Sequence, residues 1–337
     1  MTDAILSYIY DREQRDFSPY AAFTLKTRGR LAPEAEDPTR TAYQRDRDRI
    51  VHTKALRRLM HKTQMFLSPE GDHYRTRLTH TLEVMQVART MARGLRLNED
   101  LTEAIALGHD LGHTPFGHAG EDALDGVYEQ GFRHWQHSLR IVDVLEKGGE
   151  GLNLTYEVRD GILNHSGDNT ACTLEGRLVK LADRIAYINH DIDDAIRAGI
   201  LSYESVPKHL RDALGQTQSQ RIKTMVCSVI EHSMGRDDVG MDAGIGEATA
   251  ELRSFMFENI YMNSLAKTEE AKAKEILRRL YMYFIANPSE VSAEYAQNIA
   301  RDGVPRTVCD YIAGMTDNYA TIMFTDKIVP KAFYYAR

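Results

Sequence analysis

The sequence is poor in cysteine and proline, and neither sign of charge dominates it. Its three cysteines, Cys172, Cys227 and Cys309, are odd in number and share no ligand-like spacing. Neither a disulfide framework nor a zinc knuckle is therefore indicated, and a reducing, cytoplasmic location fits best. The 42 Lys and Arg against 49 Asp and Glu give a net charge of -7. This balance argues against nucleic acid as the dominant partner of the whole surface.

Long apolar segments are absent too. No uninterrupted apolar run reaches the length of about 18 residues that a membrane helix needs. Residues 1–16 also lack the basic stretch followed by an apolar one that marks a secretory signal. We therefore expect neither secretion nor a membrane partner. A glycine-rich Walker loop, an internal repeat and a low-complexity tract are missing as well.

The apolar residues that are present follow a helical period. Prolines number nine, and apolar positions recur every three or four residues through most of the chain, which predicts an all-α fold. The clearest buried stripe runs over residues 174–195, and a second passes through Leu78, Leu82, Met85, Ala88, Met91 and Leu95. A third helix should begin near residue 99 and end between residues 108 and 112, where glycines follow.

Length and loop composition suggest how the chain is divided. With 337 residues, the chain exceeds the usual size of one compact domain. We expect a mobile acidic loop over residues 34–39 and a glycine-rich loop over residues 235–246. The prediction is an N-terminal extension over residues 1–40, a helical core over 41–230 and a helical C-terminal subdomain over 231–337.

Histidines and carboxylates are concentrated in one part of the sequence. Seven of the 13 histidines fall between residues 73 and 137. His109 and Asp110 are adjacent, and neighbours on a regular helix do not face the same point, so joint ligation needs a helix end. His80 lies on an earlier expected helix and Asp183 on the polar side of a later one. These four side chains can therefore converge from three helices.

Histidine nitrogens combined with carboxylate oxygens favour a divalent metal. Such a set suits manganese, iron, cobalt, nickel or zinc, and it tolerates magnesium where substrate phosphates complete the shell. Taken alone, each histidine is more often a structural residue than a ligand. The combination indicates a metal site, with Mn²⁺ or Mg²⁺ expected and Fe, Co, Ni and Zn as alternatives.

Extended motifs surround these residues. The motifs are Tyr43-Gln-Arg-Asp-Arg-Asp-Arg-Ile50, Arg57-Arg-Leu-Met-His-Lys-Thr-Gln64, Arg75-Thr-Arg-Leu-Thr-His80, His109-Asp-Leu-Gly-His-Thr-Pro-Phe-Gly-His118 and Leu181-Ala-Asp-Arg-Ile-Ala-Tyr187. They stand in the order typical of HD proteins and, over residues 43–194, resemble the deoxyguanosinetriphosphate triphosphohydrolase family. The resemblance implies an HD-domain helical core with additional C-terminal helices, and the same four metal ligands.

Further histidines are candidates for proton transfer. His118 and Glu121 are three residues apart at the expected start of a helix, so the carboxylate can orient the imidazole and raise its basicity. The alternative is a surface histidine beside an N-terminal carboxylate. The resemblance makes His113 a phosphate or proton-transfer residue, although it could merely cap the turn. It also matches His134 to a family histidine, but the sequence that follows is Trp-Gln-His-Ser rather than Asn-Glu-Gln-Ser.

Another set of residues is expected to bind the substrate. Asp183, Tyr187 and Asp191 are spaced by four and share one helix stripe. The resemblance implies that Tyr187 closes over a deoxyribose and that Asp191 bonds its 3'-hydroxyl; the alternative is an ordinary polar helix face.

Two arginines and a glutamine complete the expected substrate site. Arg77 shares a helix face with His80, and Arg184 neighbours Asp183; guanidinium groups suit phosphate oxygens. Gln64 corresponds to a family glutamine near the sugar and base.

The resemblance implies metal-dependent hydrolysis of deoxynucleoside triphosphates, dGTP or several, to deoxynucleoside and inorganic triphosphate. Water would attack the α-phosphorus, and His118 would protonate the leaving 5'-oxygen. Two alternatives are an HD nucleotidase or phosphodiesterase on another phosphate ester, and a non-catalytic regulatory protein that senses nucleotides or single-stranded DNA. A homo-oligomer is also expected, with an activating nucleotide and single-stranded DNA as candidate partners.

Overall fold

The computed structural model describes residues 2–64, 75–261 and 264–331, and His73 lies outside them. The described chain is helical, as predicted, and its extended pairing is limited to two isolated bridges, Arg30 with Thr155 and Thr63 with Thr76. None of the described helices is both long enough and apolar enough to cross a membrane.

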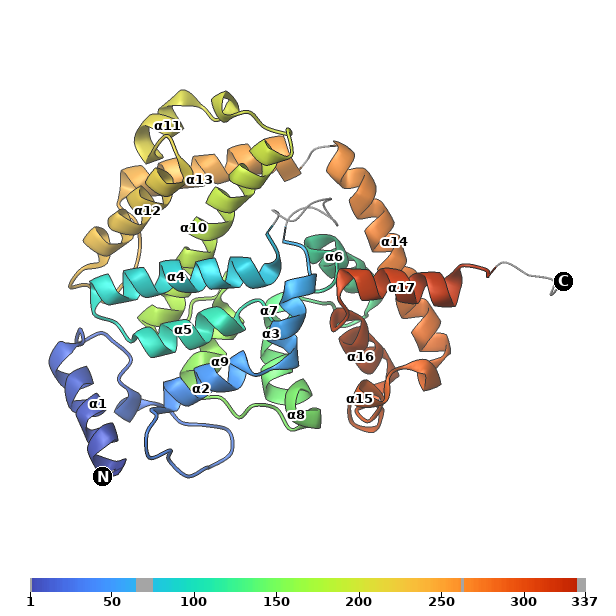
Figure 1. Ribbon diagram of the computed structural model, residues 1–337, viewed down its shortest axis with the longest axis horizontal. Coiled ribbons are helices and arrows are strands. Elements are labelled where there is room, and N and C mark those ends of the chain that lie inside the picture. The colour runs from blue at the N-terminus through green and yellow to red at the C-terminus, as the bar shows by residue number, and fades with distance from the viewer. Residues whose placement is uncertain (1, 65–74, 262–263, 332–337) are drawn as a thin grey trace.

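The described helices are labelled in chain order in Figure 1. The α-helices are α1 (Thr2–Asp16), α2 (Ala42–Val51), α3 (Lys54–Arg58), α4 (Arg77–Leu95), α5 (Glu99–Gly108), α6 (Gly117–Val127), α7 (His134–Arg140), α8 (Glu146–Gly149), α9 (Tyr156–Asn164), α10 (Leu174–Arg197), α11 (Lys208–Leu214), α12 (Gln218–Ser233), α13 (Ala243–Met256), α14 (Ser264–Ala286), α15 (Ala293–Ala296), α16 (Ile299–Ala313) and α17 (Asp317–Ile328). The 3₁₀ and π segments are η1 (Thr24–Lys26), η2 (Leu59–His61), η3 (Ile141–Leu145), η4 (Tyr203–Ser205), η5 (Phe257–Tyr261) and η6 (Pro288–Glu290).

The three helices expected from periodicity, α4, α5 and α10, pack together at the centre of the first buried cluster, which is described below with the second. α4 and α5 pack on each other, and α10 packs against both (Figure 1). Each begins at a capping side chain: Thr76 accepts from Thr79 N, Asn98 from Leu101 N and Thr173 from Gly176 N. Such caps satisfy backbone donors that the first turn of a helix leaves free. The predicted positions of these helices are confirmed.

The buried face of α4 differs from the expected stripe. Leu82 is 44% exposed, whereas His80, Thr81 and Val84 are buried. In the first turn of α4, His80 Nε2 lies 3.0 Å from Asp183 Oδ1 on α10. Further along the helix, Ala88, Met91 and Leu95 of the expected stripe are buried.

The expected glycine-rich loop is shorter than predicted. α13 begins at Ala243, after Asp242 caps it by accepting a hydrogen bond from Ile245 N at 3.1 Å. Gly244 and Gly246 therefore lie in a helix, because an aspartate N-cap outweighs the low helix propensity of glycine here.

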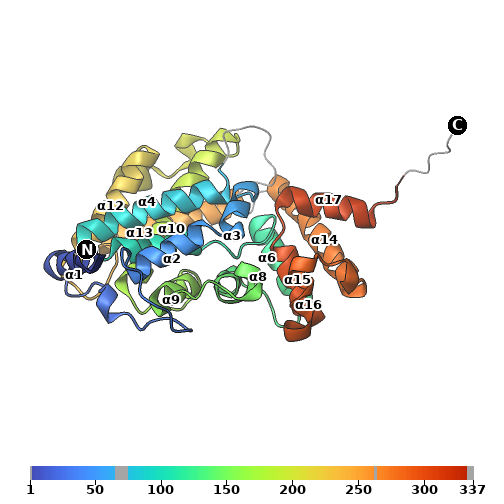
Figure 2. The same ribbon diagram turned by 60° about the horizontal axis from the view of Figure 1, so that its bottom comes forward.

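The apolar residues form two buried clusters. The first joins α2, α4, α5, α9, α10, α12 and α13. The second joins α6 to α14, α16 and α17, and contains Phe116, Leu124, Leu277 and Ile312. Figure 2 shows α6 beside α14, where the helices of the first cluster meet those of the second, and α6 and α14 are in contact. Helix α6 thus belongs by packing with helices that follow it by more than 130 residues.

Candidate metal centre

The four residues expected to hold a metal converge on one buried point. His80 lies in the first turn of α4, His109 caps the C-terminus of α5, and Asp183 lies in the middle of α10. His80 Nε2 is 3.0 Å from Asp183 Oδ1. His109 Nε2 is 3.5 Å from Asp110 Oδ1 and 3.9 Å from Asp183 Oδ1. The ligand atoms of His80, His109 and Asp110 lie within 4.8 Å of one another.

The end of α5 explains how adjacent residues reach the same point. The helix stops at Gly108, and His113 N donates to Asp110 O at 3.2 Å in the turn that follows. His109 Nδ1 donates to Ala106 O at 2.6 Å, since a carbonyl only accepts. This bond fixes the tautomer and leaves Nε2 as the acceptor.

The free nitrogen of His109 is the observation that tests the fit of a metal. Within the described chain, His109 Nε2 is buried and has no hydrogen-bond partner. An unpartnered buried acceptor is rare, and an ion or an ordered water molecule is what commonly satisfies it. Two imidazoles with two carboxylates are a donor set suited to a divalent ion. The cluster fits a divalent metal.

Charge around the carboxylates keeps them ionised, as metal binding requires. Burial by itself would raise the pKa of Asp110, but His113, His109 and Arg77 outweigh it and hold that pKa well below its usual value. Burial likewise opposes ionisation of Asp183, but the hydrogen bond from His80 lowers its pKa below the usual value.

A second cluster of side chains adjoins the first through Asp110. The rings of His113 and His134 stack with centroids 4.0 Å apart and planes inclined by 15°. His113 Nε2 is 3.1 Å from Asp110 Oδ1. The ligand atoms of Asp110, His113 and His134 also lie within 4.8 Å of one another. Residues from the turn after α5 and from α7 therefore form one continuous site.

Glu121 lies closer to His134 than to His118, its expected partner. Its carboxylate accepts from His134 Nδ1 at 2.8 Å and from His134 N at 3.1 Å, whereas His118 Nδ1 lies 3.7 Å away. Burial would raise the pKa of Glu121, but the hydrogen bonds from His118 and His134 lower it well below its usual value. Glu121 is thus an anion held between the two histidines. The His118 side chain is 80% exposed.

Arg77 lies between the metal cluster and the start of α6. Its side chain is 2% exposed, and its Nη1 donates to Asp110 Oδ2 at 3.0 Å. A Cβ added to Gly117 would lie 2.9 Å from Arg77 Nη2. Glycine at this position therefore leaves room for the guanidinium.

The four remaining residues expected to bind the substrate lie on α10 and before α4. Tyr187 is half-buried one turn after Asp183; burial raises the pKa of its phenol, and Arg253 on α13 opposes that rise. Asp191 is buried a further turn along α10. Arg184 is half-buried and forms no ion pair within the described chain. The Gln64 carbonyl lies near Gly117, 3.7 Å from the point where a Cβ would be.

His165 is a member of the site that the sequence did not indicate. It follows α9, and its ring lies 5.0 Å from that of His109 and 5.3 Å from that of His134. Its Nδ1 donates to Ile162 O at 2.7 Å. Burial, His109 and His134 lower its pKa to about 3, so the ring is neutral. The sequence offered only a single histidine at a helix end, which is typical of structural histidines.

Lys62 and Asp317 are two further residues beside the site that the sequence did not indicate. Both are buried. Lys62 Nζ donates to the His113 carbonyl, and an Asp317 carboxylate oxygen accepts from Phe116 N.

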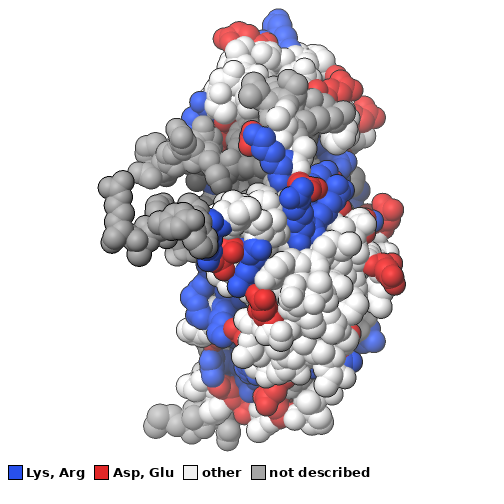
Figure 3. All heavy atoms as spheres, turned by 90° about the vertical axis from the view of Figure 1, so that its right-hand side faces the viewer, with Lys and Arg blue, Asp and Glu red and all other residues white. Residues whose placement is uncertain are grey.

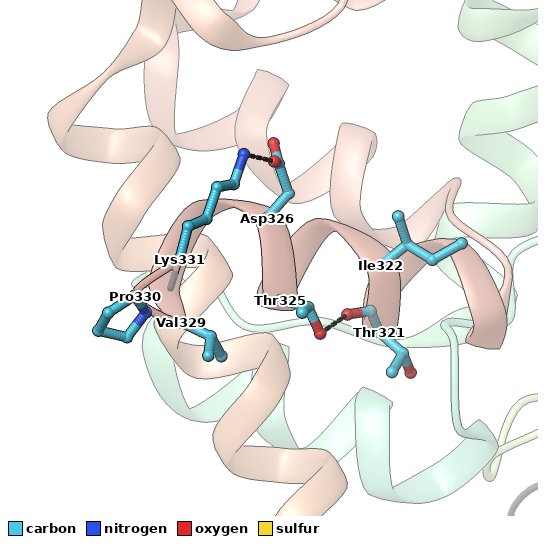
Figure 4. A pocket seen from close by; sticks show the side chains of 7 residues that line it. All are labelled: Thr321, Ile322, Thr325, Asp326, Val329, Pro330 and Lys331. Atoms are coloured by element: carbon cyan, nitrogen blue, oxygen red, sulfur yellow. Dashed lines mark hydrogen bonds and ion pairs between the residues drawn. The ribbon is translucent and has the colours of Figure 1, made fainter. Parts of the chain in front are cut away.

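A hollow elsewhere on the surface does not belong to this site. It has a volume of about 460 Å³ and is lined by the end of α17, where Lys331 pairs with Asp326 (Figure 4). None of its lining residues belongs to either histidine cluster. Figure 3 shows both basic and acidic side chains among the described residues of the face that carries α14 and α17.

Comparisons with protein families match two parts of the chain. A model of the HD domain matches residues 77–188, and a model of the phosphohydrolase-associated domain matches residues 239–326. The first range contains the metal cluster, and the second contains most of the helices that follow the core.

Related proteins match nearly the whole chain. A deoxyguanosinetriphosphate triphosphohydrolase-like protein of Caldanaerobacter subterraneus subsp. tengcongensis is 56% identical over 96% of this chain and 95% of its own. A protein of the same description from Desulfatibacillum aliphaticivorans is 47% identical over 95% of this chain and 97% of its own. A crystal structure of a phosphohydrolase (BT4208) from Bacteroides thetaiotaomicron has a similar fold, with a TM-score of 0.53, 19% identity, and coverage of 80% of this chain and 66% of that one.

Proposed function

This chain belongs to the deoxyguanosinetriphosphate triphosphohydrolase-like family of HD-domain phosphohydrolases, and from that premise we propose that it hydrolyses deoxynucleoside triphosphates. The products are a deoxynucleoside and inorganic triphosphate. The observation that supports this most is the continuity of a metal-type cluster with a second, histidine-rich cluster through Asp110. One cluster provides a place for a metal, and the other provides groups for phosphate and for a proton.

His80, His109, Asp110 and Asp183 are the residues that would hold the divalent ion, with Mn²⁺ and Mg²⁺ as the candidates. When bound, such an ion acts as a Lewis acid and activates water for attack on phosphorus. The unpartnered His109 Nε2 supports this assignment.

His118 is the proposed general acid. Attack by water on the α-phosphorus forms a new P–O bond and breaks the bond to the 5'-oxygen, which leaves as the deoxynucleoside hydroxyl and needs a proton. His118 is exposed at the start of α6, and the Glu121 carboxylate lies 3.7 Å from its Nδ1. A neighbouring carboxylate can orient such an imidazole for the transfer.

Arg77, Arg184, His113 and His134 are the proposed phosphate residues. Arg77 is held by Asp110 next to the metal cluster, and its Nε, buried as well, has no partner in the described chain. Positive and donor groups fixed before the substrate arrives stabilise the charge of the triphosphate without reorganisation.

Tyr187, Asp191 and Gln64 are the proposed residues for the sugar and base. Tyr187 and Asp191 continue from Asp183 along one face of α10, so a nucleotide with its α-phosphate at the metal can lie along this helix. Close packing of a tyrosine ring against the sugar disfavours a 2'-hydroxyl. This arrangement favours deoxyribonucleotides over ribonucleotides.

The test is a panel of all four deoxynucleoside triphosphates, singly and in mixtures, with Mn²⁺ or Mg²⁺, in which released triphosphate is measured by ion chromatography. We expect triphosphate and deoxynucleoside in equal amounts. Asp110→Ala should lose bound metal and reduce turnover by at least about 100-fold, because a metal supplies several kcal/mol of transition-state stabilisation. The matched control, Asp237→Ala, removes an exposed carboxylate and should behave as the parent protein.

Other products would identify other functions. Release of orthophosphate, or turnover of monophosphates alone, would indicate an HD nucleotidase and contradict the proposal. Binding of nucleotides or single-stranded DNA without turnover would indicate a regulatory protein. Retained turnover in Asp110→Ala would contradict the metal assignment.

A further inference from the structure

The turn between His113 and His118 has an unfavourable backbone conformation. Phe116 has φ +62° and Gly117 has φ +56°, so two consecutive residues are left-handed. A left-handed Phe is uncommon, and such a residue persists only where its surroundings impose the conformation. The rings of His113 and His118, at the two ends of this turn, lie 5.7 Å apart.

Asp317 holds the C-terminal end of this turn. Its Oδ1 accepts from Phe116 N at 2.9 Å, and its Oδ2 accepts from Thr63 N at 3.0 Å and Thr63 Oγ1 at 2.8 Å. Asp317 is the first residue of α17 and is buried. The three bonds together fix the direction of the carboxylate and restrain Phe116 and Thr63 relative to α17.

Lys62 holds the N-terminal end of the same turn. Its Nζ donates to the carbonyl of His113 and, at 2.8 Å, to the carbonyl of Ala313 at the end of α16. Its own carbonyl accepts from Arg77 N at 3.0 Å. Lys62 is buried. It therefore contacts the backbone of a proposed phosphate residue as well as that of His113.

Apolar packing also holds this turn against the C-terminal helices. The Phe116 side chain belongs to the second buried cluster, with residues of α14, α16 and α17. A Cβ added to Gly120 would lie 2.0 Å from the Pro115 carbonyl, so the turn is pressed directly against α6. The turn has little room to adopt another conformation.

We infer that Lys62 and Asp317 are positioning residues, through which the C-terminal helices set the conformation of the turn that carries His113 and His118. The proposal rests on the proposed function, because it assigns these histidines to the reaction. Its consequence is that α16 and α17 take part in catalysis without touching the substrate. We expect the proposed metal ligands to stay in place in variants of either side chain, since they come from α4, the end of α5 and α10.

The experiment uses two near-isosteric variants of the full chain, Asp317→Asn and Lys62→Met. Matched controls are Asp326→Asn, an exposed aspartate of α17 paired to Lys331, and Lys54→Met, an exposed lysine paired to Glu294. Metal content, unfolding midpoint, kcat and KM for a deoxynucleoside triphosphate are measured for all four. We expect the two test variants to retain metal and to lose about 10- to 100-fold in kcat, the range typical of residues that orient active-site groups. KM should change by less than about threefold, because the substrate contacts remain.

A second readout does not depend on activity. In protein labelled with ¹⁵N-histidine and loaded with Mg²⁺, the ring signals of His113 and His118 are assigned with His→Gln variants. Asp317→Asn should shift these two signals and leave those of His80 and His109 in place, whereas Asp326→Asn should shift neither pair. A general loss of stability would instead lower activity in proportion to the folded fraction and leave the folded ring signals unchanged.

The outcomes separate this inference from the proposed function. If the parent protein releases no triphosphate from any deoxynucleotide, the proposed function fails, and the ring signals still test the positioning. If Asp317→Asn keeps the parent kcat and ring signals, the positioning is overturned. Unfolding of both variants at the assay temperature would make the two residues purely structural and would also overturn it.

Discussion

His137 is a buried histidine on α7 whose surroundings decide its charge. Burial, Arg306 and Arg140 lower its pKa well below the usual value, so the folded protein keeps it neutral. In the unfolded chain it takes up a proton as the pH falls through about 6.5. The unfolded state then binds more protons than the folded one, and so the free energy of unfolding decreases as the pH falls below about 6.5.

We predict that His137→Gln weakens this pH dependence. The amide can still accept from Arg306, as the ring does at 3.1 Å, but it does not titrate. Between pH 7 and pH 5 the variant should lose about 2 kcal/mol less unfolding free energy than the parent protein, since one such histidine contributes up to about 1.4 kcal/mol per pH unit. Urea unfolding at both values measures this, and identical losses would contradict the neutral state.

Sequence patterns predicted the proposed metal ligands but not all the contacts around them. His80, His109, Asp110 and Asp183 were predicted as one set, and the structure brings them together. The closer pairing of Glu121 with His134 was not predicted. This pairing depends on the path of the chain between α6 and α7, which local spacing does not encode. His165 was missed because its contact with His109 and His134 depends on how α9 packs, which local spacing does not encode either.

At the scale of elements, Gly112 determines how α7 packs against the turn after α5. A Cβ there would lie 2.2 Å from His134 O and from Ser138 N. Ser138 Oγ in turn accepts from Gly112 N at 2.8 Å and donates to His109 O at 2.7 Å. The approach of α7 thus supports the backbone of a proposed metal ligand.

We predict opposite effects for alanine at two helix-associated glycines. Gly112→Ala should reduce the free energy of unfolding by about 3 kcal/mol, because backbone atoms cannot yield to the added methyl group. Gly246→Ala in α13, where the nearest atom to an added Cβ is 3.8 Å away, should increase it by roughly 0.5–1 kcal/mol through helix propensity. Chemical denaturation measures both, and destabilisation by the second change would contradict the open space described there.

Periodicity and capping predicted α4, α5 and α10 because both signals are local. The extent of the glycine-rich loop was wrong, since Asp242 starts α13 within it. The exposed Leu82 was not expected either, because a periodic stripe gives the period of a helix but not which polar residues must also face inward.

At the scale of the whole molecule, a buried ion network joins α7 to α16. Arg140 donates to both carboxylate oxygens of Asp310 at 2.9 to 3.0 Å, and Arg306 Nε lies 2.9 Å from the same group. Asp310 is 1% exposed. Arg140 and Asp310 are 170 residues apart in the sequence, so no local pattern could have predicted the pair.

We predict that Asp310→Asn lowers the free energy of unfolding by about 3 kcal/mol, since it removes the buried carboxylate that Arg306 and Arg140 share, although Arg140 keeps its ion pair with Asp302. The control Asp212→Asn removes an exposed carboxylate, 55% accessible and 3.9 Å from Lys208, and should change stability by less than about 1 kcal/mol. Calorimetry compares the two. Equal effects would show that the network does not stabilise the contact between the two parts.

Helix α6 gives the protein a constraint on its evolution. It carries His118 and Glu121 for the site, yet its apolar face completes a buried cluster with α14, α16 and α17. A recombination that exchanged the last helices between relatives would supply a new partner surface to Phe116 and Leu124 while keeping the old residues on α6. Those two stretches must therefore be inherited together or change in step, although more than 130 residues separate them along the chain.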